Sequence, residues 1–218
     1  MAATLRQLLA ALPRAEVRNP ARQGGDDLAV EEIVYDSRRA GPGSLFVAYR
    51  GVENDGHEHA AAAVAKGAVA AVVERELPGL GVPQVLVPNG REALAHLAAA
   101  WHGYPARRLT VVGVTGTDGK TTTSNLLHSI LSAAGRRAGL VTTVNAVIGE
   151  RVLDTGLHTT TPDAPDLQRF LAEMVDAGLE MAVLEVTSHG LEHHRVTSCD
   201  FDLAAVTNVT HEHLDIHG

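Results

Sequence analysis

The sequence predicts an α/β protein, with a small N-terminal α/β domain followed by the first part of a P-loop-type domain built on a parallel sheet. Three observations support this fold class. Short β-like runs alternate with Ala-rich helical stretches along the chain. Aromatic residues make up 3% of the chain and hydrophobic residues 45%, so the core must consist mainly of Ala, Val and Leu. A loop rich in glycine and threonine, Gly113 to Thr123, separates a β-branched run from an amphipathic stretch.

Length and charge exclude several classes of protein. The 218 residues are enough for two small domains or one large one. Lys and Arg total 18 against 26 Asp and Glu, a formal net charge of −8, which argues against a nucleic-acid-binding protein. Cys199 is the only cysteine, which excludes an internal disulfide and fits a reducing, cytoplasmic compartment. Neither a signal peptide nor an apolar run of roughly 18 residues is present, so we expect no membrane partner.

The N-terminal domain is expected to span residues 1–107. It begins with a short amphipathic helix, in which Leu5, Leu8, Leu9 and Leu12 recur at helical spacing. The turn Gly41-Pro42-Gly43 separates the first two expected strands. In chain order the expected elements are strands over 32–37 and 44–50, a helix over 57–68, strands over 68–74 and 83–88, and a helix over 89–102.

A second domain is expected over residues 108–218, because a β-branched run of the fully buried kind begins after Arg107 and Arg108. Alternating strands and helices of this kind predict a parallel sheet with right-handed crossovers. The expected strands cover 109–114, 138–142, 144–152, 180–186 and 202–207, and the expected helices cover 120–134 and 163–177.

The loop GVTGTDGKTTT is the strongest functional signal and is typical of a phosphate-binding loop. Its glycines let backbone N–H groups turn toward a polyphosphate, and the helix that follows adds its positive N-terminus. Lys120 supplies a cation for the outer phosphates, and the Thr121 hydroxyl can bind Mg²⁺. The strict P-loop spacing requires glycine at position 114, which is Val114. A glycine- and threonine-rich turn without a ligand is therefore the alternative.

Acidic and imidazole side chains follow two later strands, where Mg²⁺ ligands are normally found. Glu185 ends the strand MAVLEV, and the segment THEHLDIHG follows the strand LAAVTNV. That segment contains His211, His213 and Asp215, which match the start of the H-x-H-x-D-H signature of dinuclear metallohydrolases. Position 216 is Ile and the next histidine comes one residue late, so the signature is incomplete. An exposed strand end is the alternative for Glu185.

Taken together, these motifs resemble those of the Mur ligase family, and within it the MurE type, over nearly the whole chain. The matching pieces are DSR at 36–38, PGSLFVAYRG, DGHEHAAAAVAKGA, GTDGKTTT, HTTTPDAPDLQ, EVTSHGLEHHRV and TNVTHEHLDIHG. Amide ligases that build folylpolyglutamate or cyanophycin would share the GKTT loop, but we would not expect them to share the SHGL, HRV and DSR pieces. The combination is therefore specific to this family.

The resemblance implies roles for individual residues. It implies that the ATP phosphates are bound by Gly116, Thr117, Asp118, Gly119, Lys120, Thr121 and Thr122. Lys120, Glu185 and His213 would be catalytic, and Thr121, Glu185 and His213 would surround Mg²⁺. The UDP-sugar substrate would contact Ser37, Val52, Glu53, Asn54, Thr160, Thr161, Thr187, His193 and Arg195. Without the resemblance, a surface charge is the simpler interpretation of Arg195, and a strand end that of the Thr run.

The implied reaction is ATP-dependent amide formation in peptidoglycan precursor synthesis. The substrates would be UDP-N-acetylmuramoyl-L-alanyl-D-glutamate and a diamino acid, joined through an acyl phosphate. Three residues depart from the pattern usual in the family: Asp118 replaces Asn, Glu212 replaces Asp, and His193 replaces Gln.

The resemblance also implies a longer protein. In the family, a lysine that becomes carbamylated and the domain that selects the amino acid follow the point that corresponds to Gly218. We therefore expect this chain to be part of a longer enzyme and inactive alone, with meso-diaminopimelate as the added residue on general frequency only. Two alternatives stay open: a stand-alone nucleotide or UDP-sugar binding module, and a metallohydrolase that uses the cluster His211, His213 and Asp215.

Overall fold

The computed structural model describes residues 3–18, 28–51, 54–154 and 161–210, and these form two compact units, Met1–Trp101 and His102–Gly218. The boundary between them precedes the one expected near residue 107. The short 3-10 helix η3 (Pro105–Arg108) explains the difference, because Ala106 is buried in the core of the second unit with Leu109. The helix η3 and the three residues before it therefore belong to the second unit.

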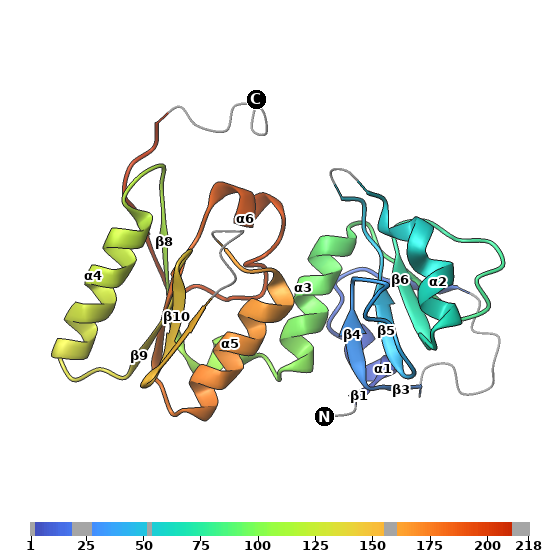
Figure 1. The fold of residues 1–218 in the computed structure, drawn as a ribbon, viewed down its shortest axis with the longest axis horizontal. Coiled ribbons are helices and arrows are strands. Elements are labelled where there is room, and N and C mark those ends of the chain that lie inside the picture. Colours follow the sequence, from blue (N-terminus) through green and yellow to red (C-terminus); the bar gives the residue numbers. More distant parts are fainter. Residues whose placement is uncertain (1–2, 19–27, 52–53, 155–160, 211–218) are drawn as a thin grey trace. The chain divides into compact units, whose positions relative to one another are not determined.

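A five-stranded sheet forms the centre of the first unit (Figure 1). Four strands are parallel: β4 (Glu32–Val34), β5 (Ser44–Val47), β6 (Ala70–Val73) and β7 (Gln84–Leu86). The fifth, β2 (Glu16–Arg18), pairs antiparallel with β7 at the edge. Two further strands, β1 (Ala3–Thr4) and β3 (Ala29–Val30), form a separate two-stranded antiparallel sheet.

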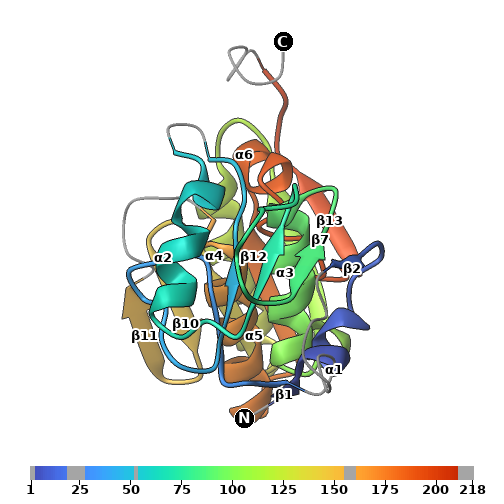
Figure 2. The ribbon, with the colours of Figure 1, turned by 90° about the vertical axis from the view of Figure 1, so that its right-hand side faces the viewer.

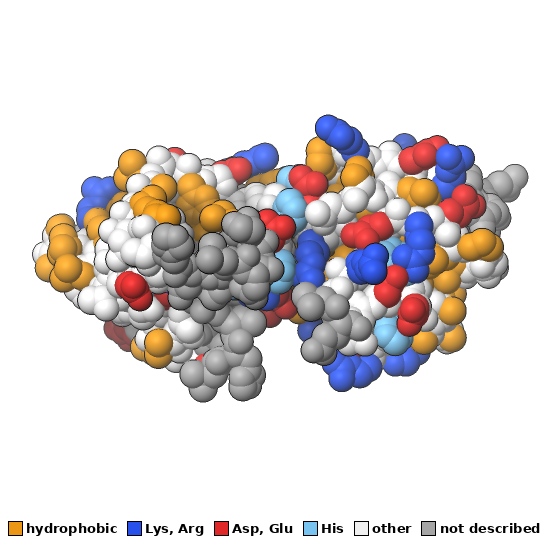
Figure 3. Space-filling model, turned by 90° about the horizontal axis from the view of Figure 1, so that it is seen from above, with side chains coloured by type: hydrophobic (Ala, Val, Ile, Leu, Met, Phe, Trp, Pro, Cys, Tyr) orange, Lys and Arg blue, Asp and Glu red, His pale blue; other side chains and the backbone are white. Residues whose placement is uncertain are grey.

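Both faces of this sheet are covered by helices, which lie on opposite sides of it in Figure 2. Helices α1 (Leu5–Leu9) and α3 (Gly90–Trp101) pack on Leu45 and Val47, whereas α2 (Ala60–Ala65), which follows the 3-10 helix η2 (Gly56–His59), packs on Phe46. Alternate side chains of β5 thus enter opposite cores, as the two-residue period of a strand requires. On the face seen in Figure 3, acidic and basic side chains of this unit lie interspersed.

The second unit has a six-stranded mixed sheet in the order β11-β10-β9-β12-β8-β13. Strands β8 (Thr110–Thr115), β9 (Ala138–Val141), β12 (Met181–Glu185) and β13 (Leu203–Val206) are parallel. The single strand expected over 144–152 is wrong: β10 (Asn145–Ile148) and β11 (Arg151–Asp154) form an antiparallel hairpin. Gly149, with φ of 61°, provides the left-handed backbone that the two-residue turn needs.

Helices α4 (Lys120–Ala133) and α5 (Ala164–Asp176) cover opposite faces of this sheet (Figure 1). Leu127 of α4 packs against Val183, whereas Leu171 of α5 belongs to the core that contains Leu184. A third helix, α6 (Ser188–Glu192), follows β12 and was not expected. Within the described residues, no helix combines the length and the apolar character needed to cross a membrane.

Candidate functional site

The loop between β8 and α4 lies at the carboxyl edge of the second sheet. Gly116 and Gly119 have φ of 136° and 79°, so both adopt backbone conformations that favour glycine. Helix α4 then begins at Lys120, where its first N–H groups lack intrahelical acceptors and can receive an anion. A cavity of about 310 Å³ opens here, lined by Thr117, Asp118, Gly119, Lys120, Thr121, Thr122, Thr143 and Glu185. The predicted phosphate-binding residues from Thr117 to Thr122 therefore share one cavity.

Lys120 is folded back over its own loop. Its Nζ atom donates hydrogen bonds to the carbonyl oxygens of Gly116, at 2.8 Å, and Thr117, at 2.7 Å. The ammonium group therefore lies beside the cavity, and the partners that the described residues give it are neutral carbonyl groups. An incoming phosphate would give it a stronger, charge-assisted acceptor.

Glu185 and Thr121 meet at the wall of this cavity. Glu185 ends β12 and is 2% exposed, and its two carboxylate oxygens accept the Thr121 hydroxyl at 2.9 and 3.0 Å. The same carboxylate accepts the backbone N–H and the hydroxyl of Thr143, each at 3.1 Å. A buried carboxylate is thus held by hydrogen bonds within reach of the phosphate-binding loop.

The donor set suits a magnesium ion. A threonine hydroxyl and a carboxylate are oxygen ligands of the kind Mg²⁺ prefers, and Mg²⁺ normally completes its shell with water and substrate phosphate. The third predicted ligand, His213, lies outside the described residues, as do His211 and Asp215. In the part of the chain that the structure describes, no group of three or more His, Cys, Asp or Glu side chains could hold a metal.

Thr143 is a site residue that sequence reasoning missed. It follows β9, which neighbours β12, so its segment leaves the sheet at the same edge as Glu185. The buried Thr142 shapes the turn, because its hydroxyl donates to the Asn145 carbonyl at 3.2 Å and accepts the N–H of Val144. The position of two threonines just after a buried strand was the available signal.

Three of the predicted substrate-binding residues meet on the other side of Glu185. The Thr161 hydroxyl lies 3.2 Å from both the hydroxyl and the backbone nitrogen of Thr187. Arg195 donates to the Thr161 carbonyl at 3.0 Å and forms an ion pair with Asp163 at 3.1 Å. The Thr161 hydroxyl also reaches the Glu185 backbone carbonyl, at 3.4 Å. One network therefore connects the expected substrate residues to the backbone of the expected metal ligand.

The glycine of the SHGL motif is explained by this network. A Cβ atom at Gly190 would lie 2.9 Å from the Thr161 hydroxyl oxygen, closer than real Cβ contacts allow. His193 follows α6, and its ring packs edge-on against His189 with centroids 6.1 Å apart. Thr160 lies outside the described residues.

The remaining predicted substrate residues belong to the first unit. Ser37 follows β4 and Asn54 follows β5, and because these strands are parallel neighbours, both segments leave the sheet at the same edge. The Ser37 carbonyl accepts a hydrogen bond from Lys66 Nζ at 2.8 Å, and the Asn54 carbonyl accepts one from the Gly51 N–H at 2.8 Å. Val52 and Glu53 lie outside the described residues.

Two aspartates near these residues accept several hydrogen bonds. Hydrogen bonds from the Arg38 side chain and backbone lower the pKa of Asp36 to about 2. Hydrogen bonds from the backbone and ring of His57 hold the pKa of Asp55 well below its ordinary value. The buried His57 ring is fixed at its other nitrogen too, because Nε2 accepts the N–H of Glu74 at 2.9 Å. Asp55 therefore anchors the chain that follows Asn54.

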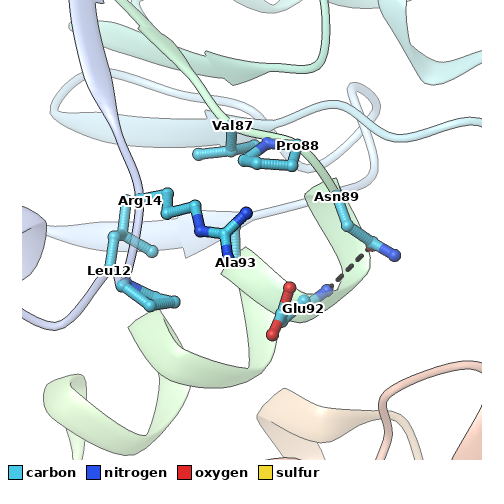
Figure 4. A pocket seen from close by; sticks show the side chains of 8 residues that line it. Leu12, Arg14, Val87, Pro88, Asn89, Glu92 and Ala93 are labelled. Atoms are coloured by element: carbon cyan, nitrogen blue, oxygen red, sulfur yellow. Dashed lines mark hydrogen bonds between the residues drawn. The ribbon is translucent and has the colours of Figure 1, made fainter.

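Another cavity lies in the first unit, and none of the predicted site residues lines it. It has a volume of about 210 Å³ and lies between the segment after α1 and the junction of β7 with α3 (Figure 4). Arg14 and Glu92 enter it from opposite sides, and Asn89 caps α3 by accepting the Glu92 N–H at 3.1 Å. Its neighbouring opposite charges give it no evident preference for an anion.

Comparisons with known proteins identify related families and relatives. The model of the Mur ligase middle domain matches residues 114–218, and that of the Mur ligase family, catalytic domain, matches residues 29–102. A UDP-N-acetylmuramyl-tripeptide synthetase of Roseiflexus sp. (strain RS-1) is 47% identical over 91% of this chain and 40% of its own length. A UDP-N-acetylmuramoyl-L-alanyl-D-glutamate--2,6-diaminopimelate ligase of Geobacillus thermodenitrificans is 45% identical over 98% of this chain and 42% of its own length.

Solved structures agree with these relatives. A UDP-N-acetylmuramoyl-L-alanyl-D-glutamate--2,6-diaminopimelate ligase matches 100% of this chain and 42% of its own with a TM-score of 0.78 at 28% identity. A MurF ligase from Thermotoga maritima in complex with ADP matches 81% of this chain and 37% of its own with a TM-score of 0.51 at 27% identity. The chain thus spans about two fifths of the length of these relatives. These comparisons give no support to the metallohydrolase or to the stand-alone binding module.

Proposed function

Because the chain belongs to the Mur ligase family, we propose that it forms the substrate- and nucleotide-binding part of an ATP-dependent ligase of peptidoglycan synthesis. The substrates would be UDP-N-acetylmuramoyl-L-alanyl-D-glutamate and a diamino acid, by analogy with the name of the Geobacillus relative. On that analogy the diamino acid would be 2,6-diaminopimelate. Residues 1–107 would bind the UDP-sugar, and residues 108–218 would bind ATP.

The nucleotide would bind in the cavity at the start of α4. The backbone of Gly116 to Thr122 would surround the phosphates, with Lys120 turned from its two carbonyl acceptors toward them. Thr121, Glu185 and His213 would hold Mg²⁺. The bound Mg²⁺ would neutralise phosphate charge and favour transfer to the carboxylate of the substrate.

The substrate would bind to both units. Ser37 and the turn Val52–Asn54 would contact its uracil nucleotide end. Thr160, Thr161, Thr187, His193 and Arg195 would contact its phosphate and its sugar-peptide part. Two polyanions have to approach each other in such a reaction, so the role of these cations and hydroxyl donors is to offset their repulsion and fix their orientation.

One observation carries the proposal: the Thr121 hydroxyl, next to the phosphate-loop lysine, lies 2.9 Å from the buried carboxylate of Glu185. Two ligands separated by 63 intervening residues of sequence meet where a nucleotide-bound cation would sit. The arrangement predicts Mg²⁺-dependent nucleotide binding. The alternative, a metallohydrolase that uses His211, His213 and Asp215, predicts no such nucleotide binding.

Calorimetric titration with ADP in the presence of Mg²⁺ tests this function directly. We expect Lys120→Ala to weaken binding at least tenfold, because a charge-assisted contact to phosphate is lost. Lys66→Ala is the matched control, since Lys66 is the only other lysine of the chain, and it should change the affinity less than twofold. Equal losses in both variants, or no binding by the unaltered chain, would contradict the proposal.

A further inference from the structure

The phosphate-binding loop is bordered along one side by the segment that follows β13. Strand β13 pairs with β8 up to Val206 and Thr115, and the pairing continues beyond the strands. The N–H of Thr207 donates to the Thr115 carbonyl at 2.9 Å, and the N–H of Thr117 donates to the Asn208 carbonyl at 3.0 Å. Residues 207–208 therefore run beside the loop.

Side chains of this segment hold Asp118 from both directions. The Asn208 side-chain oxygen accepts the N–H of Asp118 at 2.9 Å. The Thr207 hydroxyl lies 2.7 Å from the Asp118 carbonyl, to which it donates, and 3.2 Å from the Thr115 carbonyl. The peptide units before and after Asp118 are therefore both fixed by partners outside the loop.

The contact between the two segments is too close for a side chain on the loop. A Cβ atom built at Gly116 would lie 2.1 Å from the Thr207 hydroxyl oxygen and 2.7 Å from the Asn208 carbonyl oxygen. Gly116 also has φ of 136°. Glycine at this position is thus required by the neighbouring segment as well as by the turn.

We propose that Thr207 and Asn208 are positioning residues that set the shape of the phosphate-binding loop. By fixing both peptide units of Asp118, they direct the carbonyl groups of Gly116 and Thr117 toward Lys120 and the carbonyl of Asp118 toward Thr207. Phosphate is then left to the N–H groups at the start of α4 and to the Lys120 ammonium. The identity of the ligand as a nucleotide phosphate rests on the proposed function. The contacts of Thr207 and Asn208 with the loop do not depend on that function.

Amide hydrogen exchange and Mg²⁺–ADP titration of the same variants test this role. Asn208→Leu removes the acceptor of the Asp118 N–H, so exchange of that amide should become at least tenfold faster. Thr207→Val removes the hydroxyl but keeps the shape of the side chain, and we expect it to weaken Mg²⁺–ADP about tenfold, the effect of one hydrogen bond. Thr207→Ser keeps the hydroxyl and should bind within threefold of the unaltered chain.

Thr110→Val serves as the control, because Thr110 is exposed at the opposite end of β8. The inference is overturned if the Asp118 amide of Asn208→Leu exchanges as in the unaltered chain, or if Thr207→Val and Thr110→Val bind Mg²⁺–ADP equally. If the unaltered chain binds no nucleotide, the proposed function fails, and the exchange of the Asp118 amide still decides whether residues 207–208 shape the loop. If Asn208→Leu unfolds, Asn208→Ser replaces it, because serine shortens the side chain that carries the acceptor of the Asp118 N–H.

Discussion

Glu185 carries a buried carboxylate in the second unit. A carboxylate this buried is costly unless its oxygens are hydrogen-bonded, and here two threonine hydroxyls and one backbone N–H supply the donors. Two of the three donors come from Thr143, which follows β9 and is not part of the phosphate-binding loop. Thr143 can therefore keep the carboxylate in place when Thr121 turns to a metal ion.

Thr143→Val tests this division of roles. The variant keeps the backbone N–H but loses the hydroxyl that lies 3.1 Å from Glu185. We expect the factor by which Mg²⁺ strengthens ADP binding to fall about fivefold to tenfold, the net contribution of one typical hydrogen bond. The ADP affinity in EDTA should stay unchanged. Titrations with and without Mg²⁺ measure it. An equal loss under both conditions would assign Thr143 to the shape of the cavity instead.

Asp118 places a negative charge at the rim of the cavity. At about 6 Å from a phosphate, such a charge would cost roughly 3 kcal/mol at an effective dielectric constant of 20. The side chain is exposed, so solvent screens most of this repulsion. We expect Asp118→Asn to raise the affinity for Mg²⁺–ADP by less than tenfold in calorimetric titration. A gain of 100-fold or more would show that Asp118 directly opposes the nucleotide.

Among the elements, helix α5 illustrates how burial rather than composition determines stability. Leu171 is fully buried in the core beneath the sheet, whereas Leu126 of α4 is 59% exposed. Leu171→Ala should lower the free energy of unfolding by about 2–5 kcal/mol, and Leu126→Ala by less than about 1 kcal/mol. Urea denaturation of both variants checks this. Similar losses would mean that the exposed face of α4 is packed against something.

Elements with a clear period were predictable from the sequence. Continuous apolar runs predicted β8, β9 and β12 to within about a residue at most ends, and the Gly/Thr loop predicted the start of α4. The hairpin of β10 and β11 was not predictable, because its two strands form one strand-like run of sequence that only Gly149 and Glu150 interrupt. Helix α6 has only five residues, too few for a helical period to show.

The site was predictable only where local motifs carry it. Gly116 to Thr122 are contiguous and Glu185 ends a strand, so both were singled out. Thr143, Thr207 and Asn208 were missed, because their contacts depend on which strands are neighbours in the sheet. Strand order is a long-range property that spacing along the chain does not reveal. Knowing that β9 and β13 flank β12 and β8 was the missing information.

At the scale of the whole molecule, acid should destabilise the first unit through two carboxylates whose pKa is lowered in the folded state. Asp36, with its pKa lowered to about 2 from 3.8, and Asp55, lowered in the same direction, both lie in the first unit. A depressed pKa means that the folded state binds protons less readily than the unfolded one. The stability from these groups is therefore complete above about pH 4–5 and is lost as the pH falls through about 2.

Thermal unfolding between pH 5 and pH 2 measures this dependence. We expect Asp36→Asn and Asp55→Asn each to lower stability at pH 5 and to make the loss between pH 5 and pH 2 less steep than in the unaltered chain. Glu180 lies in the second unit, so Glu180→Gln should leave the loss of first-unit stability between pH 5 and pH 2 unchanged. Parallel pH profiles for Asp55→Asn and the unaltered chain would show that this carboxylate does not anchor the first unit.

The Mg²⁺ dependence of ADP binding by Glu185→Gln tests the central claim most directly, since the variant removes the charge of the carboxylate while preserving its shape. If Thr121 and Glu185 hold the cation that accompanies the nucleotide, Mg²⁺ should strengthen ADP binding at least tenfold in the unaltered chain and less than twofold in the variant. The same enhancement by Mg²⁺ in both proteins would contradict the account.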